Sequence, residues 1–248
     1  MGKLDKNKIE IFDFILDTSF ENVRFKNNSL IINTINPHSY CLTRYDKIFN
    51  EALKSSDILL PDGIGIVLAA KILNKQTINK IAGADVHQYL LEQAHLKSQK
   101  VFYLGASEHT LELIENKVKK EFPNITVSSF SPPYKPQFSK TESAQMLEKV
   151  NHFKPDVLFV GMTAPKQEKW VHANKDILDV QVITSIGAVF DFYAGTVKRS
   201  SQFWISLGLE WLPRFLREPK RLAKRNLIST PKFLLEVIWY KIFGRGIL

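Results

Sequence analysis

Short apolar runs alternate with amphipathic stretches through residues 30–190, and this alternation limits the possible folds more than any other feature of the chain. The expected strands are residues 30–35, 58–60, 101–104, 125–127, 156–160 and 180–186. The expected helices are residues 37–55, 64–73, 84–97, 108–122, 141–153 and 166–177. Strands that alternate with helices form a parallel sheet with helices on both faces. The pattern therefore predicts an α/β fold with a Rossmann-like, mostly parallel sheet.

The composition is that of an ordinary globular protein, with 44% hydrophobic and 24% charged residues in a chain of 248. This length suits one large domain with an appendage. No basic and apolar leader is present, and no run of 18 apolar residues occurs, so we expect neither a signal peptide nor a membrane span. The single cysteine, Cys41, fits a reducing compartment and is expected to pack inside a helix.

The positive charge is concentrated near the C-terminal end. Of the net charge of +9, residues 1–197 contribute +1 and residues 198–248 contribute +8. We therefore divide the chain into an α/β core (residues 1–197) and a basic, aromatic-rich helical appendage (residues 198–248). Such asymmetry indicates an anionic partner: nucleic acid, an anionic membrane surface or a phosphorylated substrate. Interleaved aromatic and basic residues suit a helix at a membrane interface, although a helix packed on the core is an equal alternative.

The sequence LLPDGIG at residues 59–65 places Asp62 between a strand end and a helix start. Open α/β sheets bind ligands just outside the carboxyl ends of their strands. Gly63 lets a ligand approach the backbone closely. Two roles fit Asp62: a helix N-cap, which the local pattern favours, and a general base.

Other strand ends also pair glycine with polar side chains. Gly105 lies at a strand–helix turn, where a helix N-terminus could face phosphate. In GMTAPKQE at residues 161–168, Lys166 could contact phosphate, and Gln167 could bind a sugar hydroxyl or amide. SIGAVFD at residues 185–191 adds Gly187 and Asp191. None of these is decisive alone, because tight turns need no ligand and charged first turns also favour the helix dipole.

Several common site motifs are absent. The chain has no G-x-x-x-x-G-K-[ST], no complete G-x-G-x-x-G and no D-x-D. Its six histidines lack the spacing of zinc ligands, so we expect no metal site and no cofactor. A pyrophosphate leaving group would then be stabilised by cations and backbone dipoles. A nicotinamide-dependent oxidoreductase and a nucleic-acid-binding protein remain as alternatives, although the balanced core and the Trp and Phe content favour lipid or diphosphate over nucleic acid.

Taken in order, these motifs resemble the WecG/TagA/CpsF bacterial glycosyltransferases (glycosyltransferase family 26). The segments that carry the resemblance span residues 34–221: TINP at 34–37, LPDGIG at 60–65, IAGAD at 81–85, PKQE at 165–168, GAVFD at 187–191, GLEWL at 208–212 and RFLREPKR at 214–221. The resemblance covers about residues 30–232, most of the chain.

The resemblance implies an inverting, metal-independent transfer of a sugar, N-acetylmannosamine or a related hexose, from a UDP-sugar to a polyprenyl-diphosphate-linked acceptor sugar. The reaction would serve cell-surface polysaccharide or teichoic acid-type synthesis at the cytoplasmic face of the membrane. The resemblance also makes Asp62 the proposed base. By the same resemblance, the appendage closes over the active site and contacts the diphosphate and the membrane. Together with the strand-end motifs, it predicts these substrate-binding residues: Thr34, Asn36, Gly63, Gly105, Lys166, Gln167, Gly187, Asp191, Arg214, Arg221, Lys224 and Arg225.

Some positions depart from the family pattern. Lys80 stands where an arginine is usual, and the two are not equivalent for bidentate phosphate contacts. Ser200 and Ser201 replace a usual Ala-Pro, and a Pro-Pro loop at residues 132–133 replaces a Gly-Tyr pattern. These departures leave the donor sugar open, and the oligomeric state, a homo-oligomer included, is open too. A chain ending near Lys198 is expected to fold yet be almost inactive.

Overall fold

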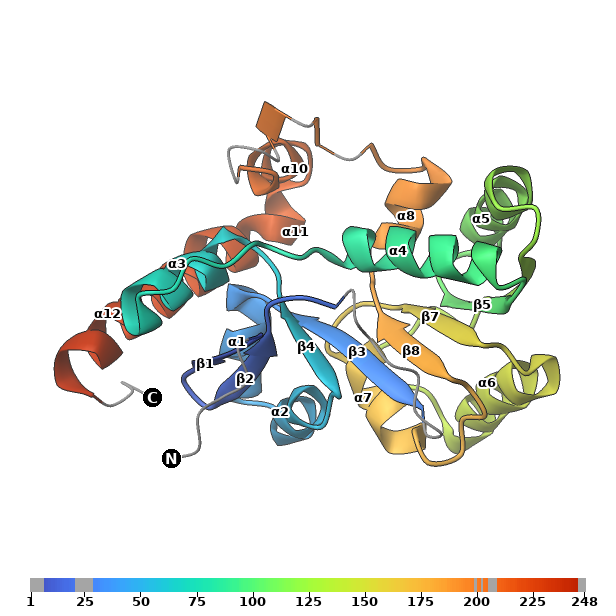
Figure 1. The fold of residues 1–248 in the computed structure, drawn as a ribbon, viewed down its shortest axis with the longest axis horizontal. Coiled ribbons are helices and arrows are strands. Elements are labelled where there is room, and N and C mark those ends of the chain that lie inside the picture. Colours follow the sequence, from blue (N-terminus) through green and yellow to red (C-terminus); the bar gives the residue numbers. More distant parts are fainter. Residues whose placement is uncertain (1–6, 21–28, 199, 202, 205–208, 245–248) are drawn as a thin grey trace.

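The computed structural model describes residues 7–20, 29–198, 200–201, 203–204 and 209–244, without the side chains of residues 217, 221 and 224 (Figure 1). Its centre is a six-stranded sheet in the order β4-β3-β8-β7-β5-β6, in which all neighbours are parallel. The strands are β3 (Leu30–Ile35), β4 (Ile58–Pro61), β5 (Lys100–Gly105), β6 (Thr126–Phe130), β7 (Val157–Gly161) and β8 (Val182–Ser185). The predicted α/β class is confirmed.

Helices cover both faces of this sheet (Figure 1). Because side chains alternate along a strand, Val101 and Tyr103 of β5 point to one apolar cluster, and Phe102 and Leu104 point to another. The first cluster contains α4 (Gly83–Leu96), α5 (Glu108–Glu121) and α8 (Val189–Ala194), and the second contains α6 (Lys140–Phe153) and α7 (Lys166–Asn174). The two layers hold the strand ends rigidly in one row.

A third apolar cluster joins the N-terminal and C-terminal parts of the chain. Residues 1–29, which the pattern left unassigned, contain an antiparallel hairpin of β1 (Lys8–Ile11) and β2 (Phe14–Asp17). The hairpin packs with α1 (Pro37–Thr43), α3 (Ile64–Asn74) and α12 (Thr230–Phe243). Phe233 and Val237 of α12 are fully buried there. A chain ending near Lys198 would expose this cluster, so we now expect it to be destabilised as well as inactive.

Two element predictions were wrong. The single helix expected over residues 37–55 is two helices, α1 and α2 (Lys47–Lys54), because the Asp46 side chain accepts the Phe49 N–H and starts a new helix. The helix α8 was not predicted at all. Its six residues are too few for a helical period to show in the sequence.

The appendage is helical, as expected, wherever the structure describes it at length. It comprises α10 (Trp211–Arg217), α11 (Pro219–Ala223), a π-helical turn η1 (Lys224–Ser229) and α12. Figure 1 shows α12 running beside α3, and the two helices are in contact. Within the described ranges, every helix is too short or too polar to cross a bilayer.

Candidate active site

A cavity of about 1320 Å³ follows the carboxyl edge of the parallel sheet. Its lining includes a residue just past the end of each strand of that sheet: Asn36, Asp62, Ala106, Ser131, Met162 and Ile186. This edge is where open α/β sheets bind their ligands. The appendage supplies another part of the wall through Glu210, Trp211, Arg214, Leu222, Arg225 and Asn226.

The structure brings together almost all the residues predicted from the sequence. Those that line the cavity are Thr34, Asn36, Asp62, Gly63, Gly105, Lys166, Gln167, Gly187, Asp191, Arg214 and Arg225. The side chains of Arg221 and Lys224 lie outside the described part of the chain. The roles assigned to these residues remain predictions, but their convergence on one cavity is what those roles require.

Asp62 follows β4 directly, and its backbone N–H donates to the Ile35 carbonyl over 2.9 Å. The N-cap interpretation of Asp62 is wrong: α3 begins at Ile64, its cap position is Gly63, and no side chain caps it. Gly63 has a φ of +87°, which favours glycine. The Asp62 side chain is therefore not used as a helix cap and lines the cavity.

The charge on Asp62 is governed by opposing influences. Burial raises the pKa of its carboxyl, and the negative charge of Glu210 raises it further. The positive charges of Arg225, Lys80 and Arg214 act in the opposite direction. Three cations, two of them from the appendage, therefore line the same cavity as Asp62 and favour its ionised form. Cations in such a place are suited to bind a diphosphate.

Two of these cations are held by contacts that the sequence did not predict. The Ile81 N–H donates to the Pro61 carbonyl over 2.8 Å, which keeps Lys80 beside the end of β4. The Lys80 ammonium lies 2.7 Å from the Glu210 carboxylate of the appendage. The Arg214 guanidinium carbon lies 4.7 Å from the centre of the Phe192 ring, a cation–π distance. Sequence reasoning did not assign a site role to Glu210, although the GLEWL motif contains it.

Gln167 is fixed by a second buried acid. Its Oε1 accepts the Met162 N–H over 3.1 Å, and its Nε2 donates to Glu168 Oε1 over 2.8 Å. Burial raises the pKa of Glu168 to about 7, and within the described structure its Oε2 has no hydrogen-bond partner. Glu168 also lines the cavity. The sequence presented Glu168 only as a favourable first-turn charge, so its burial was missed.

Other predicted residues have partly structural contacts. Asn36 Oδ1 accepts the N–H groups of His38 and Ser39, each over 3.0 Å, and so caps α1. Asp191 Oδ1 accepts the Thr196 hydroxyl over 3.3 Å. The Lys166 ammonium donates to the Lys135 carbonyl over 2.8 Å. These contacts orient the side chains along the cavity wall.

Neither a reactive thiol nor a metal cluster is seen among the described residues. Cys41 is buried, burial raises its pKa to about 11, and its Sγ donates to the Ser229 carbonyl over 3.4 Å. This confirms its packing role. The part of the chain that the structure describes has no group of three or more His, Cys, Asp or Glu side chains that could hold a metal ion.

The carboxyl edge of a parallel sheet is where α/β enzymes bind their ligands, and the cations at this edge are suited to phosphorylated ones. A model of the "Glycosyl transferase WecG/TagA/CpsF family" matches residues 9–246. The chain belongs to this family and is a glycosyltransferase.

Several curated relatives are similar over most of their length. One from Bacillus spizizenii is 31% identical over 96% of this chain and 90% of its own, and one from Bacillus subtilis is 33% identical over 84% and 78%. A relative from Staphylococcus aureus is 29% identical over 85% and 80%. All three are named N-acetylglucosaminyldiphosphoundecaprenol N-acetyl-beta-D-mannosaminyltransferase.

Proposed function

We propose that the protein transfers N-acetylmannosamine, or a closely related hexose, from a UDP-sugar to an N-acetylglucosamine linked to polyprenyl diphosphate. The names of the relatives support this acceptor and this sugar. The product would enter teichoic acid or related cell-surface polysaccharide synthesis. The reaction is proposed to invert the anomeric centre and to need no metal ion.

The position of Asp62 is the observation that carries the proposal. Asp62 lines the cavity, does not cap α3, and shares the cavity with cations from both parts of the chain that lower its pKa. An acceptor hydroxyl is a poor nucleophile until a base takes its proton. In a single displacement, the hydroxyl oxygen attacks the anomeric carbon, the bond to UDP breaks, and the proton passes to Asp62.

The departing UDP gains negative charge as this bond breaks. Lys80, Arg214 and Arg225 are the cations that lower the pKa of Asp62. We propose that the same cations stabilise the charge on the departing UDP. Such stabilisation is strongest where water is excluded. Gln167, fixed by Met162 and Glu168, is proposed to bind a hydroxyl or acetamido group of a sugar.

We infer that the enzyme works at the cytoplasmic face of the membrane as a peripheral protein. Phe233 and Val237 of α12 pack against the core, while other apolar side chains of α12 face solvent. One helix can therefore both pack on the core and lie at a membrane interface. The exposed large hydrophobic residues of α12 are Leu235, Ile238, Trp239, Ile242 and Phe243. Anionic lipid is the proposed partner of the surrounding basic residues. Because the chain belongs to a glycosyltransferase family, we no longer consider the oxidoreductase and nucleic-acid-binding alternatives.

One assay tests the reaction. UDP-sugars are screened for UDP release with and without polyprenyl-diphosphate-linked N-acetylglucosamine, in the presence of a chelator. We expect acceptor-dependent release with UDP-N-acetylmannosamine, or a related UDP-hexose, that the chelator leaves unchanged. A strict requirement for a divalent metal would contradict the proposal. So would release that does not depend on the acceptor.

A further inference from the structure

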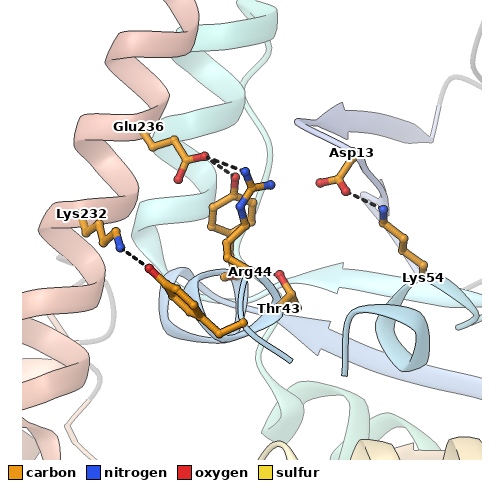
Figure 2. Close-up of polar contacts among 8 residues, drawn as sticks. Asp13, Thr43, Arg44, Lys54, Lys232 and Glu236 are labelled. Carbon is orange, nitrogen blue, oxygen red and sulfur yellow. Dashed lines mark hydrogen bonds and ion pairs between the residues drawn. The ribbon is translucent and has the colours of Figure 1, made fainter. Parts of the chain in front are cut away.

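α12 is held on α1 by a buried carboxylate. Glu236 is 2% exposed, and its Oε1 accepts the Tyr40 hydroxyl over 2.8 Å. The Arg44 guanidinium lies 3.9 Å from the same oxygen. Figure 2 shows Glu236 pointing from α12 toward Arg44. Burying a carboxylate is costly unless it is paired, so this contact is specific rather than incidental.

Three further contacts on the N-terminal side of Glu236 continue this attachment. Ser229 Oγ lies 2.8 Å from His38 Nδ1, and the Ser229 carbonyl accepts the Cys41 thiol. Lys232 donates to the Tyr45 hydroxyl over 2.7 Å (Figure 2). Successive turns of the C-terminal helix are thus tied to α1 and the residues that follow it.

The same two segments, which are in contact, also contribute neighbouring residues to the cavity wall. Asn36 and His38 line it from α1, and Arg225 and Asn226 line it from η1. Arg225 lies one helical turn before Ser229, and its carbonyl accepts the Thr230 hydroxyl over 3.1 Å. The attachment at Ser229 and Glu236 therefore determines where Arg225 enters the cavity.

We propose that Glu236 is a positioning residue for the transfer reaction: by holding α12 on α1 through Tyr40 and Arg44, it keeps the Arg225 guanidinium facing Asp62. This inference rests on the proposed role of Asp62 as the base. It assigns a function to a buried acid that does not line the cavity and touches no substrate.

The effect of displacing Arg225 on the protonation of Asp62 depends on the other charged groups near Glu236 and Asp62. Glu236 is faced by Tyr40 and Cys41 from α1, by Arg44 just after α1 and by Lys232 from its own helix. The charge of Asp62 is influenced by Arg225 of η1, by Lys80 before α4, and by Glu210 and Arg214 at α10. His38 of α1 lines the same cavity, which makes five side chains from four segments.

Among the charges that lower the pKa of Asp62, that of Arg225 has the largest effect. If Arg225 moves away, Asp62 keeps its proton to a higher pH, and the fraction of enzyme with an ionised base falls. A simple loss of helix packing would lower stability or turnover without moving this titration.

The test compares full-length variants by two measurements: the pH profile of kcat/KM and an NMR titration of the Asp62 carboxyl. We expect Arg225→Gln to shift the acidic limb of the profile and the Asp62 titration upward by about one pH unit. Glu236→Gln and Tyr40→Phe should shift both in the same direction. The double variant Glu236→Gln/Arg225→Gln should match Arg225→Gln alone, because both act through one contact.

The exposed Asp13–Lys54 ion pair provides a matched control near the same helices (Figure 2). Lys54→Gln should leave the profile and the titration unchanged. An unmoved Asp62 titration in both folded Glu236→Gln and Tyr40→Phe overturns the inference, as does an additive double variant. The NMR titration reports the position of Arg225 whether or not Asp62 is the base. Near-normal turnover by Asp62→Asn would instead overturn the proposed function.

Discussion

Lys80 and Glu210 form an ion pair of 2.7 Å that joins the core of the enzyme to its C-terminal appendage. Both side chains line the cavity, and both influence the charge of Asp62 with opposite sign. The appendage therefore contributes more than basic residues to the site. It also contributes the Glu210 carboxylate, which pairs with Lys80, one of the cations that could bind a diphosphate.

Replacing Glu210 by glutamine removes a negative charge from beside Asp62. Because Glu210 raises the pKa of Asp62, we expect the acidic limb of the kcat/KM profile to move to lower pH. The pH profile of the purified variant checks this. A shift toward higher pH would contradict the arrangement of charges.

Removing the carboxylate of Asp62 should abolish most activity. We expect Asp62→Ala to lower turnover by roughly two to four orders of magnitude, the usual contribution of a positioned acid or base. Steady-state UDP release measures the loss. Asp176→Asn is the matched control, because Asp176 is exposed and lies outside the cavity lining.

Glu168 should make stability depend on pH. The pKa of its buried carboxyl is raised from 4.5 to about 7, so the folded state holds a proton that the unfolded state releases. Stability from this group is therefore greatest below pH 4.5 and is lost as pH rises to 7, by about 3 kcal/mol. Glu168→Gln should remove this slope and be more stable than the wild type at pH 8.

Denaturant unfolding between pH 5 and pH 8 measures the effect of Glu168→Gln. The matched comparison is Glu148→Gln on the exposed surface of α6, which should keep the wild-type slope. Equal slopes in the wild type and Glu168→Gln would show that Glu168 is ionised in the folded enzyme at every pH tested.

The exposed apolar face of α12 should control binding to anionic vesicles. Replacing Trp239 and Phe243 by serine removes two aromatic rings that contact each other, with centres 4.2 Å apart. We expect binding to weaken by about 10- to 100-fold, from the apolar area no longer buried in lipid. Vesicle sedimentation measures it.

Leu96→Ser is the control for vesicle binding, because Leu96 is equally apolar and 75% exposed but lies at the end of α4. It should bind vesicles as the wild type does. Unchanged binding by the α12 variant would place the membrane contact elsewhere on the molecule.

The residue pattern alone determined the alternating strands and helices, the parallel sheet, the strand-end positions of Asp62 and Gly105, and the first-turn position of Gln167 in the helix after β7. These follow from local properties: side-chain periodicity, glycine at turns, and the rule that strand ends carry ligand sites. The order of motifs then indicated the glycosyltransferase family, and the comparisons confirmed it.

Only the tertiary structure decided which distant groups meet. It showed that Gly63, not Asp62, occupies the cap position of α3, and that Arg225, Arg214 and Lys80 line the same cavity as Asp62. It also buried Glu168 and Glu236 as acids with specific partners. Contacts between segments far apart in the chain leave no period in the sequence, because they depend on how packed layers close on one another. For this reason the chemistry of the strand ends could be predicted, whereas the attachment that completes the site could not.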